Sequence, residues 1–551
     1  MGRTRVLLLG AALLAAAPAP SALAGGVSEY PFRDWENGWS IKTILGWESR
    51  PPSLPGTSTE ARVAAGWYPK GTESDSWCMV LVLGRYFGDA VREPAAGGDP
   101  AAGPAPAGAV PGAPDPAKPP PPQAPERFRK WMDGWFKELR KTPRSKLTGE
   151  GKACRLGPDP GWQYEGEYEI TTTQRSSFGD REWYDATDTW KILAVGGRRG
   201  DYEVGTVFFL HEDVFEKGVN PGTVRESALS LRFLDAKDMA RRRDELEAKA
   251  KRAGGGDEAW IVRVRARIPE GWRYFRRGDT VYVHPDAIPG STVETMAARL
   301  DAMRKKVYQK IFPAAIDPDA PPAVVKVTRD QRQYLSYGAP EGSLGYFAAR
   351  QRELVLFYQA ADWWDRIDST AVLFHEGFHQ YMNQALDGLA AHPWFEEGFG
   401  DYFGGWRLFE GEPRPGELAA RRYRMGEILD EDAWIPTGDL LRMEWDAFYG
   451  RGPDAADPGI TYPQSWSLVT FLRSRKSTAC LDRYYAALKD GVKDWKALEA
   501  ARAIKEGRPV RAPGEMPDQE ARAIRAAALE QGFPGVDFEA LEKDWLAFAT
   551  K

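Results

Sequence analysis

Runs of apolar, β-branched and aromatic residues mark the N-terminal part of the chain, up to about residue 235. The segment 76–87, SWCMVLVLGRYF, is almost continuously apolar, which is typical of a buried strand. Strand-like segments follow at 162–173, 183–195 and 201–210, each enriched in aromatic and β-branched residues. These later segments supply the pairing partners that a buried strand needs. We therefore predict one β-rich module over residues 27–235.

Two segments interrupt this pattern. Residues 93–125 are nearly all Pro, Ala, Gly and Asp, and such a composition predicts a disordered insertion because it cannot bury a core. The charged run 235–253 predicts a solvated helix. Apolar and basic residues then alternate over 261–268, IVRVRARI, which predicts a half-exposed strand. We therefore expect residues 236–269 to be a connection made of a charged helix and a strand.

From residue 270 onward, short strands precede helices. A helix is predicted from Ser291 to about Lys310, opened by an S-x-x-E capping box with Glu294. Strands are predicted at DTVYVHP (279–285), at AVVKVT (323–328) and as a tight hairpin in LGYFAARQRELVLFY (344–358). The remainder is mostly helical. This order predicts an α+β domain over 270–551.

The first 24 residues have the pattern of a secretory signal peptide. Arg3 and Arg5 precede the apolar run Val6–Ala17, and Ala22-Leu23-Ala24 supplies small residues for cleavage near Ala24. The run is shorter than the roughly 20 residues that a membrane-spanning helix needs. We expect an exported protein, periplasmic or extracellular, whose mature chain has no membrane span.

The charge and the cysteine content bear on the partners and the disulfides of this protein. The formal net charge of −5 gives no sign of the basic surface that nucleic-acid binding uses, so we expect no nucleic-acid partner. Export permits a disulfide, but the sequence does not decide whether Cys78 and Cys154 pair. Cys480 is the third cysteine, and none of the three has metal-ligand spacing with another.

The stretch HEGFH, residues 375–379, carries the first candidate chemistry. In a helix, positions four apart share a face, so His375 and His379 can both reach one metal ion. Glu376 stands beside that ion, where its carboxylate can accept a proton from a metal-activated water. The motif predicts a catalytic zinc site with two of its three protein ligands.

The third ligand is expected in the segment HPWFEEGFGDYF, residues 392–403. Glu396 and Glu397 are the candidates. Asp401 lies four residues after Glu397 and can accept a hydrogen bond from the far nitrogen of a ligand histidine. The position four after Glu396 is a glycine, which offers no such group. We therefore predict Glu397 as the ligand and Asp401 as the carboxylate that orients a histidine.

HEGFH followed by WFEEGFGDY resembles the gluzincin metallopeptidases, which include thermolysin and the zinc aminopeptidases. The likeness is nearest to exported bacterial proteins with a peptidase MA-like domain. It covers residues 270–551 and implies a zincin-like catalytic domain, a small mixed sheet followed by a helical part. In the family pattern Glu397 is the third ligand and Asp401 the aspartate that orients a histidine. Glu396 replaces the usual Asn, and no G-A-M-E-N segment is present, which favours an endopeptidase over an aminopeptidase.

The resemblance implies roles for three further residues. Tyr462, expected just before a helix, would stabilise the oxyanion with its phenol; a core tyrosine flanking that helix is the alternative. Gly345 and Tyr346 would lie on an edge strand that holds extended substrate by backbone hydrogen bonds.

Together these features predict an exported zinc peptidase that cleaves peptide or protein substrates with Glu376 as general base. Two alternatives remain open. One is a zinc-containing binding or scaffold protein without turnover, whose N-terminal module contacts a cell-surface polymer. The other is an amidase acting on a non-peptide or cell-wall amide.

Overall fold

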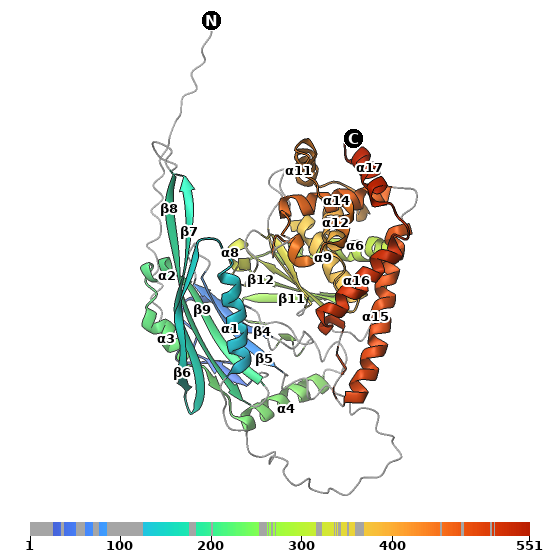
Figure 1. The fold of residues 1–551 in the computed structure, drawn as a ribbon. Helices are drawn as coiled ribbons and strands as arrows, with labels where there is room; N and C mark the ends of the chain where they lie inside the picture. Colours follow the sequence, from blue (N-terminus) through green and yellow to red (C-terminus); the bar gives the residue numbers. More distant parts are fainter. Residues whose placement is uncertain are drawn as a thin grey trace, which may run out of the picture. The chain divides into compact units, whose positions relative to one another are not determined.

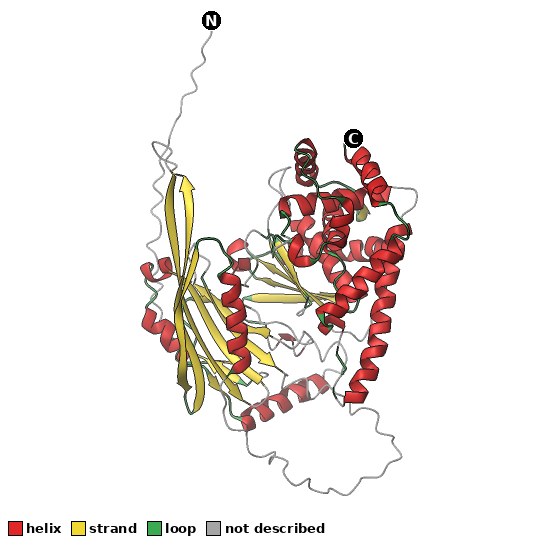
Figure 2. Ribbon diagram, in the orientation of Figure 1, coloured by secondary structure: helices red, strands yellow, loops and turns green. Residues whose placement is uncertain are grey.

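The computed structural model describes residues 26–34, 38–50, 61–69, 76–84, 125–175, 183–199, 202–252, 271–315, 322–335, 343–349, 352–358, 369–451, 455–474, 479–506 and 513–550, with a few single positions between them. The chain divides into two compact units, one made largely of residues 26–50 and 63–247 and the other of 248–551. The first is rich in strands, and the second combines a smaller sheet with many helices (Figures 1 and 2). The predicted signal peptide and nearly all of the predicted insertion at 93–125 lie outside the described residues.

The N-terminal unit is built on a seven-stranded sheet in the order β3-β4-β5-β9-β8-β7-β6. Its strands are β3 (Trp47–Arg50), β4 (Ala61–Pro69), β5 (Trp77–Gly84), β6 (Ser145–Leu156), β7 (Asp159–Arg175), β8 (Trp183–Arg199) and β9 (Tyr202–His211). The predicted buried strand is β5, and it pairs antiparallel with β9 from Trp77↔Phe209 to Gly84↔Tyr202. The four predicted strands are therefore confirmed. A smaller sheet joins β1 (Phe32–Asp34), β2 (Trp39–Ile41) and β10 (Arg232–Phe233).

Helices cover both faces of the large sheet. Helix α1 (Glu126–Leu139) buries Phe128 against the face where Gly205 lies, and a Cβ there would come within 2.2 Å of the Phe128 ring. Successive strand residues point to opposite faces. Phe208 therefore faces the other side, where it packs in one core with residues of α2 (Glu212–Glu216) and α3 (Pro221–Leu229).

The cysteines are free thiols in the structure. Cys78 lies on β5 and Cys154 on β6, and three strands separate these two in the sheet order. Neighbouring strands are roughly 4.8 Å apart, whereas a disulfide needs Cα atoms within about 7 Å. Cys78 and Cys154 are therefore too far apart to pair in this structure.

The connection is partly as expected. The charged run forms α4 (Ala236–Arg252), which confirms the predicted helix. The strand predicted at 261–268 is wrong, because its described positions Val262, Val264 and Arg265 are helical. The Ile268 amide donates to the Val264 carbonyl at 3.2 Å, four residues back. Val264 is buried and Ile268 packs beside it, so this pair shares a helical face despite the alternating pattern.

The C-terminal unit contains a five-stranded sheet in the order β11-β12-β13-β15-β14. Its strands are β11 (Trp272–Arg277), β12 (Thr280–Pro285), β13 (Ala323–Thr328), β14 (Gly345–Ala348) and β15 (Glu353–Phe357). The central strands β12, β13 and β15 are parallel, while β11 and β14 are antiparallel edges. The predicted hairpin is β14–β15, with Gly345 opposite Leu356.

Helices make up most of the rest of this unit. They are α6 (Gly290–Met303), the π-helical η2 (Arg304–Tyr308), α7 (Gln309–Ile311), α8 (Gln331–Leu335), α9 (Ser369–Ala385), α10 (Pro393–Gly404), α11 (Ala419–Asp430), α12 (Thr437–Arg442), α13 (Trp445–Phe448), α14 (Pro458–Ser474), α15 (Ala479–Glu506), the short η3 (Pro513–Glu515), α16 (Asp518–Gly532) and α17 (Phe538–Ala549). A hairpin of β16 (Arg407–Phe409) and β17 (Glu412–Arg414) separates α10 from α11. Among the described helices, none is long and apolar enough to cross a membrane.

The predicted helix from Ser291 is present, but the capping box is wrong. Helix α6 begins one residue earlier, at Gly290, and Pro289 precedes it without a capping side-chain bond. Ser291 is therefore already in the first turn, where its carbonyl accepts from the Thr295 hydroxyl at 2.7 Å. The mixed α+β class is confirmed, with a β-rich N-terminal unit and a mainly helical C-terminal part.

Two glycines bring α9 and α10 close to their neighbours. A Cβ on Gly377 of α9 would lie 2.5 Å from Leu300 of α6. A Cβ on Gly398 of α10 would lie 2.7 Å from the Ser465 carbonyl oxygen of α14. These contacts hold α9 against α6 and α10 against α14. Helices α9 and α10 also pack on each other, and they carry the candidate site.

Candidate metal centre

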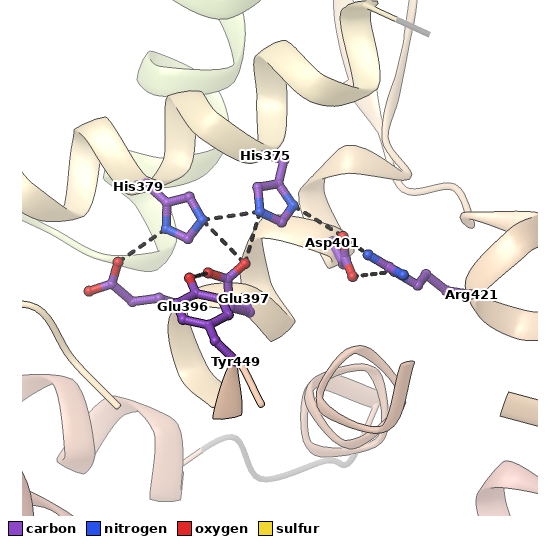
Figure 3. Close-up of polar contacts among 7 residues, drawn as sticks. All are labelled: His375, His379, Glu396, Glu397, Asp401, Arg421 and Tyr449. Atoms are coloured by element: carbon purple, nitrogen blue, oxygen red, sulfur yellow. Dashed lines mark hydrogen bonds and ion pairs between the residues drawn. The ribbon is translucent and has the colours of Figure 1, made fainter. Parts of the chain in front are cut away.

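Three side chains from α9 and α10 converge on one point (Figure 3). The Nε2 atoms of His375 and His379 are 3.0 Å apart. Glu397 Oε2 lies 3.1 Å from the first and 3.6 Å from the second. Three ligand atoms of one tetrahedral zinc would be about 3.3–3.4 Å apart, given metal–ligand bonds of about 2.0–2.1 Å. The donor set and its spacing therefore fit a zinc ion held by His375, His379 and Glu397.

The far nitrogens of both imidazoles contact carboxylates. His375 Nδ1 is 3.1 Å from Asp401 Oδ1, and His379 Nδ1 is 3.1 Å from Glu396 Oε2. A carboxylate accepts a proton donor, so Nδ1 of each ring donates to it and Nε2 is the nitrogen that faces the shared point. Once Nε2 loses its proton, both histidines have the tautomer that a metal requires.

The two adjacent glutamates of α10 therefore have different partners in the site. Successive helical residues point about 100° apart, so Glu397 reaches the shared point while Glu396 reaches the far side of His379. The other oxygen of Glu396 accepts the Ala391 amide at 2.7 Å. These two contacts fix the Glu396 side chain beside His379.

Gly400 also belongs to the site, although sequence reasoning treated it only as a position without a polar group. A Cβ on this residue would lie 2.8 Å from Cε1 and 2.9 Å from both nitrogens of the His375 ring. The ring thus lies directly over the backbone of α10, and only glycine leaves that space.

Sequence reasoning missed two further residues. Arg421 of α11 donates to Asp401, which is itself bonded to His375. The Tyr449 hydroxyl donates to Glu397 Oε1, the oxygen that faces away from His375 (Figure 3). No local motif marks either residue, since they lie 20 and 52 positions from their partners.

The electrostatics of the site favour a cation. Burial alone would lower the pKa of His375, but hydrogen bonds to Asp401 and Glu397 outweigh it and raise this pKa to about 9. Burial would also lower the pKa of His379, but Glu397 outweighs it and raises this pKa well above its usual value. The imidazoles hold the pKa of the Glu397 carboxyl well below its usual range although burial opposes this. A bound metal replaces such protons.

Glu376 lies half-buried on α9, beside the edge strand β14. Burial raises the pKa of its carboxyl, against the opposing effect of the two imidazoles. A Cβ on Gly345 would lie 3.1 Å from Glu376 Cγ and 2.4 Å from Val372, so the missing side chain lets β14 approach the helix. Tyr346, the next residue, has its ring 5.7 Å from that of Tyr334 on α8.

Tyr462 lies inside α14 rather than just before a helix, which corrects the sequence expectation. Its ring centroid is 6.2 Å from that of Tyr449, and the Arg421 guanidinium lies 5.0 Å from it. The residue is therefore beside the groups that support the candidate ligands.

The remaining histidines have structural surroundings. His392 is buried, its Nδ1 lies 2.8 Å from the Tyr484 hydroxyl, and burial lowers its pKa to about 3. His211 caps α2, and His284 Nδ1 contacts the Pro285 carbonyl at 3.0 Å.

Comparisons with known proteins add little. Neither the protein-family models nor the curated proteins match this chain. A solved structure described as cyanobacterial PsbP (CyanoP) from Synechocystis sp. PCC 6803 is similar over 38% of this chain and 93% of that one, with 9% identity and a TM-score of 0.22. That score is too low to carry an argument about this protein.

Proposed function

We propose that this protein is an exported zinc peptidase of the gluzincin type. His375, His379 and Glu397 would hold the metal, and Glu376 would act as general base. The convergence of two Nε2 atoms and one carboxylate oxygen, with every far nitrogen already bonded to a carboxylate, carries the proposal. The sheet order, with α9 beside the edge strand β14, agrees with a zincin-like domain.

When bound, zinc would lower the pKa of a water and polarise the scissile carbonyl. The chain supplies the proton handling. A carboxyl whose pKa is raised by burial can accept a proton from water and return it to the leaving amine near neutral pH, and Glu376 is that group. Tyr462 would donate a hydrogen bond to the carbonyl oxygen as charge develops on it.

An extended peptide would bind along β14. This strand is an edge of the sheet among the described strands, with β15 as its partner on one side. Strand addition places substrate backbone against such an edge. Gly345 lies beside Glu376, so a peptide paired there would pass within reach of the base.

The test compares wild type with Glu376→Gln and with Glu417→Gln, an exposed carboxylate of the same unit that pairs with Arg422. Zinc content is measured by mass spectrometry and cleavage with a mixed peptide library. We expect about one zinc in all three proteins and cleavage by wild type and Glu417→Gln alone. Zinc without cleavage in wild type would favour the scaffold or the non-peptide amidase, and absence of zinc would refute the ligand assignment. N-terminal sequencing of secreted protein would test cleavage near Ala24.

A further inference from the structure

We infer that Tyr449 is a positioning residue that restricts Glu397 to one metal-binding oxygen and so keeps a fifth coordination position of the metal open for substrate. The inference rests on the proposed zinc site. A catalytic zinc has three protein ligands and a water and can expand to five ligands during the reaction, whereas a carboxylate that binds through both oxygens takes up the fifth position.

The division of the Glu397 carboxylate is the first observation. Oε2 is the oxygen near both imidazoles, 3.1 and 3.6 Å from their Nε2 atoms. Oε1 accepts the hydrogen bond of the Tyr449 hydroxyl. A second metal bond would require the carboxylate to rotate Oε1 inward, which would stretch or break that hydrogen bond. The phenol therefore opposes two-oxygen binding.

The Tyr449 ring is held firmly enough to exert this effect. It packs against Trp445 at 5.6 Å, Phe448 at 5.8 Å and Tyr462 at 6.2 Å between ring centroids. The Arg451 guanidinium lies 5.6 Å from its centre. Aromatic neighbours on several sides limit the movement of the hydroxyl.

The backbone also fixes this residue. Tyr449 is the C-cap of the short helix α13, and Gly450 follows with a φ of +73°. The Gly450 amide donates to the Ala447 carbonyl and the Arg451 amide to the Asp446 carbonyl, the paired bonds of a Schellman motif. The chain thus turns sharply just after Tyr449, which sets the position of its side chain.

The experiment uses the full-length protein loaded with zinc, in wild type, Tyr449→Phe and Tyr402→Phe forms. Phenylalanine keeps the packed ring and removes only the hydroxyl. Tyr402 is the matched control, because it lies on α10 five residues after Glu397 and so points to a different face. X-ray absorption at the zinc edge counts the light-atom ligands, and competition with a chelator measures zinc affinity. Thermal unfolding of the metal-free proteins reports on folding.

In Tyr449→Phe we expect the ligand count to rise from about four to about five as Glu397 binds through both oxygens. Zinc affinity should fall by about tenfold, as it does when other groups that orient a ligand are removed. Tyr402→Phe should match wild type in both measurements. An unchanged ligand count and affinity in Tyr449→Phe would overturn the inference while leaving the zinc site intact. Absence of zinc from wild type would instead refute the proposed function, so the two failures are distinguishable.

Discussion

Gly400→Ala is the smallest change that should disable the metal centre without unfolding the protein. The new Cβ would lie 2.8–2.9 Å from three atoms of the His375 ring. Carbon contacts are most favourable at about 3.5–4.0 Å, so the ring must retreat by roughly 0.7 Å. Metal sites tolerate deviations of only about 0.2 Å in ligand distance.

The ring cannot retreat freely, because it is bonded at both ends. Its Nδ1 contacts Asp401 at 3.1 Å and its Nε2 contacts Glu397 at 3.1 Å. A movement of about 0.7 Å would break or bend these contacts, and loss of such orientation costs about 10–100-fold in metal affinity. That range corresponds to about 1.4–2.8 kcal/mol.

Gly426→Ala provides the control. Gly426 also lies in a helix, α11, and a Cβ added to it would have nothing within 4 Å. Alanine should stabilise this helix by about 0.5–1 kcal/mol. Zinc affinity is measured by competition with a chelator, and stability by thermal unfolding of the metal-free proteins. Wild-type zinc affinity in a folded Gly400→Ala protein would refute this account of the His375 ring.

Four further outcomes are expected. Glu396→Gln should weaken zinc binding by about tenfold in a chelator competition, because one amide oxygen cannot serve both His379 and the Ala391 amide. Zinc affinity measured across pH should rise up to about pH 9 as His375 loses its proton. Because folding raises this pKa above its ordinary 6.5, the stabilisation of the metal-free protein is full below pH 6.5 and lost through pH 9, as unfolding in urea should show. Lys326→Met should cost about 3–5 kcal/mol in urea unfolding, since Lys326 and Glu353 form a buried pair at 2.7 Å; the double variant Lys326→Met, Glu353→Leu should recover most of it.

Much of the architecture was predictable because its signals are local. The four predicted strands of the N-terminal sheet, β5, β7, β8 and β9, are rich in aromatic and β-branched residues, and α4 is marked by its charged run. The remaining strands of that sheet, β3, β4 and β6, carry a weaker pattern and were not predicted. The segment 261–268 misled because eight alternating residues also place Val264 and Ile268 four apart, and burial of that pair decided in favour of a helix. The predicted capping box is absent because α6 begins at Gly290, directly after Pro289, so Ser291 lies inside the helix and is not its N-cap.

The contacts of the candidate site are also of two kinds, local ones that the sequence predicts and distant ones that it does not. His375 and His379 share a face by helical geometry alone, and so do Glu397 and Asp401. Tyr449 reaches Glu397 across 52 positions and Arg421 reaches Asp401 across 20, through contacts set by how α10 packs on its neighbours. Periodicity carries no information about such approaches.

Glycine shows most clearly what the sequence pattern leaves out. A glycine at position 400 offers no chemistry, so a search for ligands and bases passes over it. Its value lies in the atom it lacks, because the His375 ring occupies the space of a Cβ. Gly345 works in the same way beside α9, where it lets the edge strand approach Glu376. The positions of the ligand and the base therefore depend on two residues that contribute no functional group.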